Sequence, residues 1–169
     1  MESTQDEVDR IVGSWRREAP GLDVTPMEVL SRVSRLARQL DLARKSTFAA
    51  YGLELWGFDV LSALRRSGSP YELSPSALIG EMMVTSGTMT NRIDRLVSLG
   101  LVERRRSPHD RRGVLVRLTP AGLERAEHAL ADLLVQEAAL LDDLTPAQQA
   151  KLASLLKTLA LGFERPAED

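Results

Sequence analysis

The side chains best suited to chemistry in this sequence form a polar cluster near its middle. The cluster contains Thr85, Ser86, Thr88, Thr90, Asn91, Arg92 and Arg95. Short hydroxyl side chains at the start of a helix can approach both base edges and phosphates of DNA, and the helix dipole adds attraction for phosphates. An amide such as Asn91 can pair with adenine, and Arg92 or Arg95 with guanine or a phosphate. An ordinary capped helix with a solvated polar face would show the same pattern, so the cluster alone does not decide the function.

A charged turn follows this cluster at Asp110, Arg111 and Arg112. The turn lies between two β-prone runs, residues 101–106 and 113–118, and its Pro, Asp and Gly residues favour a hairpin. An arginine on a projecting turn suits a narrow minor groove, because its planar head is weakly hydrated and always charged. The aspartate can hold one arginine extended through a charge-assisted hydrogen bond. A solvated charged turn is the alternative, but a basic hairpin tip directly after a hydroxyl-rich helix favours contact with double-stranded DNA.

The distribution of charge supports this interpretation better than the total charge does. The formal net charge is -2, whereas small DNA-binding domains are often basic. Between Thr85 and Thr119, however, there are eight arginines and only three acidic residues. The compensating acidic residues lie near positions 2–9 and 124–143. The chain therefore combines a positive segment with an acidic body, a pattern typical of proteins that bind DNA.

Helix starts are marked by a hydroxyl residue followed by proline, at Thr25, Ser74, Thr119 and Thr145. Glutamate or glutamine three residues after the first and last of these predicts capping boxes. The apolar spacing predicts helices at residues 5–17, 25–51, 53–66, 74–83, 85–99, 119–142 and 145–163.

The order helix, turn, helix and hairpin between residues 74 and 118 predicts a winged helix-turn-helix. The residues expected to pack inward from its two helices are Leu78, Ile79, Met82, Met89, Ile93, Leu96 and Val97. The expected fold class is mainly α with a small β-hairpin wing, a winged helix-turn-helix plus a helical dimerisation region. The expected divisions are N-terminal helices contributing to dimerisation at 1–52, the DNA-binding domain at 53–118, and C-terminal dimerisation helices at 119–169.

The long helices carry more apolar surface than one winged domain can cover. One broad face of the helix at 25–51 holds Met27, Leu30, Val33, Leu36, Leu40 and Phe48. The two C-terminal helices hold Leu123, Ala126, Leu130, Leu133, Leu134, Leu141, Leu152, Leu155, Leu156, Leu159 and Leu161. A second copy of the chain is the simplest cover, so we expect a homodimer. An intrachain helical hairpin packed on the long helix is the alternative.

Several classes of function find no support in the sequence. The chain has no cysteine and only two histidines, His109 and His128, which argues against a metal site or a thiol switch. It contains no nucleophile motif and no glycine-rich phosphate loop, so neither an enzyme nor a cofactor is expected. No apolar run approaches the roughly 20 residues that span a membrane, and the first residues are no signal sequence. A cytoplasmic location without membrane contact is therefore expected.

Two segments resemble the multiple-antibiotic-resistance (MarR) family of regulators. Residues 107–122, SPHDRRGVLVRLTPAG, are similar to the family's wing. Residues 83–104 are similar to its recognition helix and to the segment that follows this helix. The resemblance covers roughly Leu53 to Phe163. It implies a homodimer whose N-terminal and last two helices interlock and whose two winged domains read a pseudo-palindrome. It also implies that Arg112 enters the minor groove and that Asp110 braces it.

The N-terminal region resembles one branch of that family, whose members respond to urate or similar organic anions. The similarity rests on an extra N-terminal helix containing Trp15 and on the later segment WGFDVL, which contains Asp59. It implies a ligand pocket lined by Trp15, Asp59 and one arginine among residues 104–106, of which Arg104 is preferred. The expected function is therefore a sequence-specific transcriptional repressor released from its operator by a small organic anion or aromatic ligand.

The residues themselves leave this switch open. Asp59 lies between apolar neighbours, where an unpaired carboxylate is costly, so it needs an arginine partner with which a ligand could compete. A permanent Asp59–arginine pair would fix the domain orientation and sense nothing, and Trp15 could equally anchor a core. A winged-helix DNA-binding protein with no ligand switch, either architectural or constitutive, is the corresponding alternative.

Overall fold

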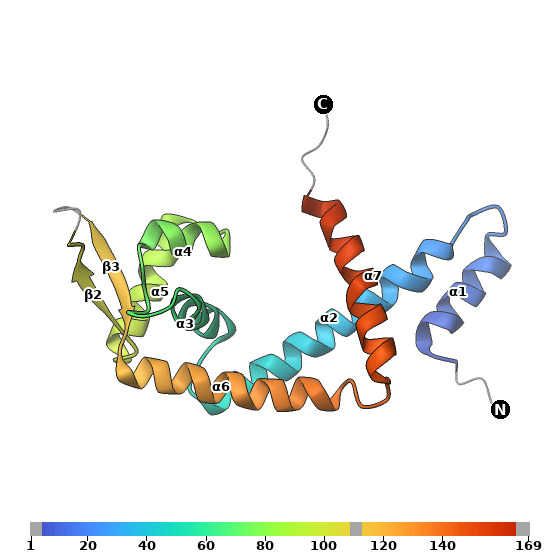
Figure 1. Cartoon of the computed structure of the whole chain (residues 1–169). Helices are drawn as coiled ribbons and strands as arrows, with labels where there is room; N and C mark the ends of the chain where they lie inside the picture. Colours follow the sequence, from blue (N-terminus) through green and yellow to red (C-terminus); the bar gives the residue numbers. More distant parts are fainter. Residues whose placement is uncertain (1–4, 109–112, 165–169) are drawn as a thin grey trace.

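The computed structural model describes residues 5–108 and 113–164 and shows a mainly helical, elongated chain with a small sheet at one end (Figure 1). The helices are α1 (Glu7–Glu18), α2 (Thr25–Ala50), α3 (Leu55–Arg66), α4 (Pro75–Met82), α5 (Ser86–Ser98), α6 (Pro120–Ala139) and α7 (Pro146–Glu164). The strands are β1 (Glu72–Leu73), β2 (Val102–Arg106) and β3 (Val114–Leu118). The predicted fold class is confirmed, including the helix-turn-helix and its hairpin.

Three of the four predicted hydroxyl caps are confirmed. The hydroxyl groups that accept a hydrogen bond from a backbone N–H of the following helix are those of Ser74, Thr119 and Thr145. Thr25 instead begins α2 itself, and the carboxylate of Asp23 accepts a hydrogen bond from its N–H at 3.0 Å. The capping box predicted with Glu28 is therefore wrong, because that carboxylate pairs with Arg16 at 2.6 Å.

The winged domain is built on a three-stranded antiparallel sheet in the order β1-β3-β2. Strand β1 was not predicted, because two residues are too short to show an alternating pattern. Helices α3, α4 and α5 pack on the sheet around the buried side chains of Leu64, Leu78 and Ile93. The rings of Phe48 and Phe58 stack with centroids 4.0 Å apart and join α2 to this core.

The inward-facing residues of the helix-turn-helix were largely predicted. Leu78, Met89, Ile93 and Leu96 are almost fully buried, and Ile79 and Met82 pack at the edge of the core. Val97 is the exception, since 37% of it is exposed. The apolar face predicted for α2 stays largely uncovered in a single chain, since only Thr47 and Phe48 of α2 are buried.

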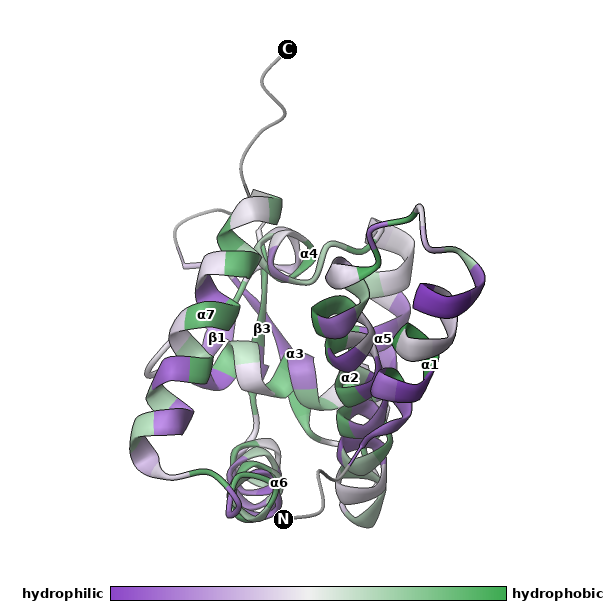
Figure 2. Ribbon diagram, turned by 90° about the vertical axis from the view of Figure 1, so that its right-hand side faces the viewer, coloured by the Kyte–Doolittle hydropathy of each residue, from purple (hydrophilic) through white to green (hydrophobic). Residues whose placement is uncertain are grey.

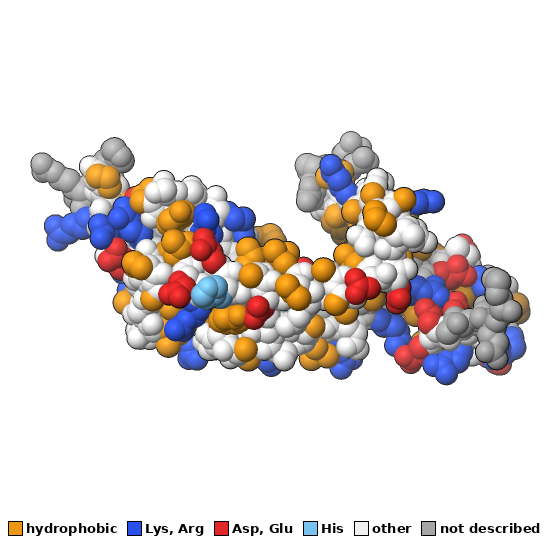
Figure 3. Space-filling model, turned by 60° about the horizontal axis from the view of Figure 1, so that its bottom comes forward, with side chains coloured by type: hydrophobic (Ala, Val, Ile, Leu, Met, Phe, Trp, Pro, Cys, Tyr) orange, Lys and Arg blue, Asp and Glu red, His pale blue; other side chains and the backbone are white. Residues whose placement is uncertain are grey.

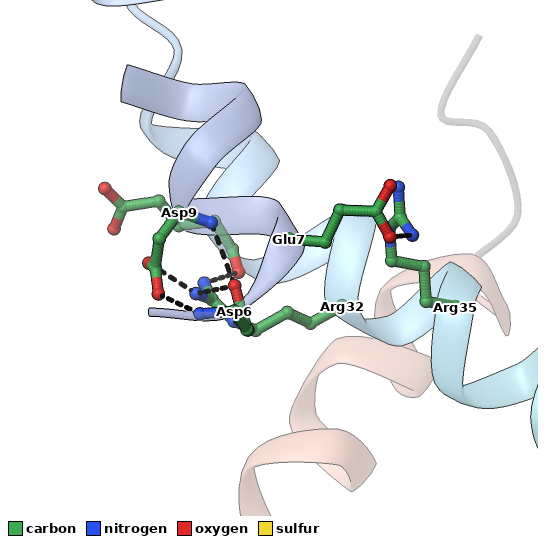
Figure 4. A network of polar contacts seen from close by, with 6 residues as sticks. Asp6, Glu7, Asp9, Arg32 and Arg35 are labelled. Atoms are coloured by element: carbon green, nitrogen blue, oxygen red, sulfur yellow. Dashed lines mark hydrogen bonds and ion pairs between the residues drawn. The ribbon is translucent and has the colours of Figure 1, made fainter. Parts of the chain in front are cut away.

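Helix α1 packs on the N-terminal half of α2 and forms a small core of its own. Val8 and Val12 are buried there against Val24 and Met27. Ion pairs surround this core, and Figure 4 shows Arg32 between the carboxylates of Asp6 and Asp9, with Arg35 beside Glu7. Because these contacts lie at residues 28–35 of α2, α1 is held at the end of α2 remote from the sheet (Figure 1).

Helix α7 stands apart from the winged domain in Figure 1, and Figure 2 shows hydrophobic residues along it. None of its described side chains is buried, although they include many apolar ones. Its exposed large apolar residues are Leu152, Leu155, Leu156, Leu159, Leu161 and Phe163. Within residues 5–108 and 113–164, no helix is long and apolar enough to cross a membrane.

Candidate nucleic-acid interface and effector pocket

The N-terminal turn of α5 presents the predicted hydroxyl cluster to solvent. Thr85 caps the helix, because its hydroxyl accepts a hydrogen bond from the backbone N–H of Thr88 at 3.3 Å. The side chains of Thr85, Ser86, Thr88, Thr90 and Asn91 are all exposed. Met89, Ile93 and Leu96 fix the opposite face in the core, so the polar face is held outward on a rigid helix. That face can offer hydroxyl and amide groups to a double helix.

The two arginines of α5 lie differently from those hydroxyls. Arg92 is half-buried on the flank of the helix, and its guanidinium carbon lies 5.5 Å from the ring centroid of Trp56 on α3. Arg95 is exposed but pairs with Glu54, with 3.0 Å between Nη2 and Oε1. In this state both guanidinium groups rest against the start of α3. Glu54 was not singled out from the sequence, and Trp56 was noted only as part of the segment WGFDVL, since no local spacing connects these two residues to α5.

The hairpin projects from the end of the molecule beside α5 (Figure 1). Its strands pair from Val102 opposite Leu118 to Arg106 opposite Val114, and the N–H of Ser107 donates to the carbonyl of Gly113 at 2.8 Å. The predicted minor-groove residues Asp110, Arg111 and Arg112 lie outside the described residues, as does His109. Their proposed contact with DNA stays a prediction.

An ion pair connects this hairpin to the recognition helix. Arg104 of β2 lies 2.5 Å from the carboxylate of Asp94 on α5, measured from Nη1 to Oδ1. Figure 3 shows Lys and Arg side chains gathered at the end of the molecule that carries the sheet. The hairpin and α5 therefore present one continuous surface, whose arginines can be neutralised by phosphates.

Asp59 lies at a cavity of about 360 Å³ between α3, α4 and α5. The cavity is lined by Trp56, Asp59, Arg66, Glu81, Met82, Val84 and Arg92. Asp59 is accessible to solvent, contrary to the expectation of a buried carboxylate, because it lies on the opposite side of α3 from Leu61 and Leu64. The surrounding protein still removes enough water to raise the pKa of this carboxyl, and the charges of Arg92, Arg44 and Arg66 oppose that shift.

The other two predicted ligand residues lie elsewhere in the single chain. Trp15 is 47% exposed on α1, in a shallow hollow formed by that helix alone. The α1 contacts on α2 and the Phe48–Phe58 stack are separated by about 20–30 Å along a helix that rises 1.5 Å per residue. Arg104 faces Asp94 rather than the cavity. One chain therefore does not bring Trp15, Asp59 and Arg104 together.

The described part of the chain shows no group of three or more His, Asp or Glu side chains that could hold a metal ion. The geometry instead defines a winged helix-turn-helix with a hydroxyl-rich recognition helix and a basic hairpin. The model of the MarR family matches residues 51–113. The chain is 36% identical over 150 residues to the HTH-type transcriptional regulator PecS of Dickeya dadantii (strain 3937), covering 89% of this chain and 90% of PecS.

Two further relatives agree. The multiple antibiotic resistance protein MarR of Salmonella typhimurium is 37% identical over 105 residues, which are 60% of this chain and 69% of that protein. The crystal structure of a mutant MarR from E. coli complexed with operator DNA has a TM-score of 0.65 and 30% identity, covering 82% of this chain and 99% of that one. The chain belongs to the MarR family. It is thus a transcriptional regulator and not an enzyme.

Proposed function

We propose that this protein is a homodimeric repressor that binds a pseudo-palindromic DNA operator and is released from it by a small organic anion. The observation that carries the DNA-binding part is the exposed hydroxyl-rich turn of α5 beside a projecting basic hairpin. A related MarR with the same fold has been crystallised with operator DNA, which supports the same use of this surface. Asn91 and Ser86 are the proposed base-reading residues, and Arg112 with its brace Asp110 reads the minor groove.

Selection of duplexes from a random pool, followed by genomic footprinting, tests this part. We expect an enriched sequence with two related half-sites whose spacing corresponds to a whole number of helical turns. Asn91→Ala should relax preference at particular base pairs, whereas His128→Ala, an exposed change on the N-terminal half of α6, should not. Failure to enrich any sequence would refute sequence-specific binding.

The homodimer is supported by the apolar surface that one chain leaves uncovered. Large apolar side chains are exposed along α7, on the C-terminal half of α6 and on the N-terminal half of α2, and Figure 3 shows many of them on one side of the molecule. Most of the stability of a helix in a protein comes from packing of its apolar face, so α7 requires a packing partner. Burying each leucine fully is worth about 1.5–3 kcal/mol, and a second copy supplies the complementary helices.

The effector pocket is supported by the position of Arg92. This arginine lines the same cavity as Asp59 and belongs to the recognition helix, so an anion bound by it acts directly on α5. Arg104, which holds Asp94 of that helix, is a second route by which an anion could act. Trp15 can join this pocket only from a second chain, because α1 of the same chain lies about 20–30 Å away along α2.

A titration with urate and a set of aromatic carboxylates tests the switch. The readouts are release of the selected operator and quenching of tryptophan fluorescence, compared between wild type and Trp15→Phe. A ten- to hundred-fold loss of DNA affinity corresponds to about 1.4–2.8 kcal/mol of coupling, within the usual range for allosteric proteins. Unchanged operator binding with every organic anion would favour a regulator without a ligand switch.

A further inference from the structure

A continuous series of contacts connects the start of α3 to both arginines of the recognition helix. The carboxylate of Glu54 accepts a hydrogen bond from the indole Nε1 of Trp56 at 2.6 Å, through Oε2. Its other oxygen, Oε1, pairs with Arg95 at 3.0 Å. The face of the Trp56 ring receives the guanidinium of Arg92 at 5.5 Å. The N-cap residue of α3 and a residue of its first turn therefore engage two residues of α5.

The carboxylate of Glu54 is not used to stabilise the start of α3. Glu54 is the N-cap residue of α3, yet no side chain caps that helix start by a hydrogen bond. Its carboxylate is used instead on the indole and on Arg95. Donation of the indole N–H to an anion increases the electron density of the ring, which strengthens the attraction of Arg92 for its face. The contacts thus reinforce one another.

The position of Arg95 gives these contacts a consequence for DNA binding. Arg92 and Arg95 are three residues apart on α5, so their side chains leave the same side of the helix. An arginine paired with a carboxylate cannot contact a phosphate at the same time. The exposed hydroxyl and amide groups of the helix, such as Asn91, carry no charge and gain little from DNA of arbitrary sequence.

We propose that Glu54 and Trp56 are positioning residues that hold Arg95 and Arg92 away from the DNA backbone and so suppress sequence-independent binding. This inference rests on the proposed function and concerns its selectivity. On a correct operator, base contacts by α5 compensate for breaking the Glu54–Arg95 pair. On other DNA the pair persists, and one phosphate contact is not made.

The test compares wild type with Glu54→Gln on the selected operator and on unrelated duplex of the same length. Both side chains of the Glu54–Arg95 pair are more than half exposed, so the expected effect is small. We expect affinity for unrelated duplex to rise about two- to five-fold, with the operator affinity nearly unchanged. The salt dependence of binding to unrelated duplex should steepen by about one counterion.

A double-mutant cycle separates this role from the general effect of removing a negative charge. In an Arg95→Ala background, Glu54→Gln should no longer change the affinity for unrelated duplex, because its action passes through Arg95. Trp56→Phe keeps an aromatic face for Arg92 but removes the indole N–H. It should reproduce part of the Glu54→Gln effect.

Three outcomes would overturn the inference: an equal gain with and without Arg95, an unchanged affinity of Glu54→Gln for unrelated duplex, or an equal gain on the operator. Each of these leaves the proposed function intact as long as wild type still prefers its operator. Failure of wild type to discriminate between operator and unrelated duplex would instead count against the proposed function.

Discussion

Gly122 is the position where the structure makes the sharpest prediction about stability. A Cβ atom added there would lie 1.9 Å from the carbonyl oxygen of Leu101 and 2.8 Å from its carbonyl carbon. These are backbone atoms just before β2, and they cannot turn aside as a flexible side chain can. The same carbonyl accepts the N–H of Thr119 at 3.1 Å, and the hydroxyl of Thr119 donates to the carbonyl of Gly100 at 2.7 Å.

Gly122→Ala therefore requires the start of α6 to move away from the segment just before β2. Overpacking of this kind costs about 1–3 kcal/mol, and weakening of the two hydrogen bonds of Thr119 adds about 1 kcal/mol each. We expect a loss of about 3–5 kcal/mol in the free energy of unfolding, a large part of the stability of a typical domain. The shift of the denaturant midpoint, measured at a fixed protein concentration, reports this loss.

Gly80→Ala is the matched control. Gly80 lies inside α4, and a Cβ there would meet no atom within 4 Å. Alanine should therefore stabilise the protein by about 0.4–1 kcal/mol through its better helix propensity and the reduced freedom of the unfolded chain. Gly122→Ala unfolding at the wild-type midpoint, or both variants shifting in the same direction, would refute the reasoning.

The remaining predictions concern α1, the hairpin, the dimer and the pocket. The contacts of Asp6 with Arg32 lower the pKa of that carboxyl from 3.8 to about 2. The contacts between α1 and α2 should therefore persist above pH 3.8 and be lost as the pH falls towards 2. The fluorescence of Trp15 reports the loss of these contacts, and Arg32→Gln should move the midpoint of this loss to higher pH. An unchanged midpoint in Arg32→Gln would contradict the prediction. Arg112→Ala should weaken operator binding and reduce its salt dependence by about one counterion, with an unchanged melting temperature; wild-type operator affinity would rule the contact out. In light scattering, Leu156→Asp should shift the protein towards monomer, whereas Met83→Asp, at a residue 93% exposed in the α4–α5 turn, should not. Asp59→Asn should weaken operator binding before any ligand is added and respond less to an effector; a full response with wild-type DNA affinity would assign Asp59 a structural role only.

Local patterns in the sequence determined the elements of the winged domain. Ser74 and Thr119 cap the helices that follow them because their hydroxyls reach backbone N–H groups three residues on, and no distant residue is needed for that. The spacing of Leu78, Met89 and Ile93 gave the buried faces of α4 and α5 for the same reason. The hydroxyl cluster of α5 could likewise be placed on a helix start from the sequence, and its exposure follows from the burial of the opposite face.

Contacts between distant segments required the tertiary structure. Strand β1 forms only because β3 provides a partner for Glu72 and Leu73, and such pairing leaves no local pattern in two residues. Nothing in the sequence indicated that Glu54 and Trp56 would engage Arg95 and Arg92, since helix packing brings these residues together. The resemblance to one branch of the family implied a pocket of Trp15, Asp59 and Arg104. Within a single chain α2 keeps α1 away from α3, because a straight helix is a rigid spacer of fixed rise.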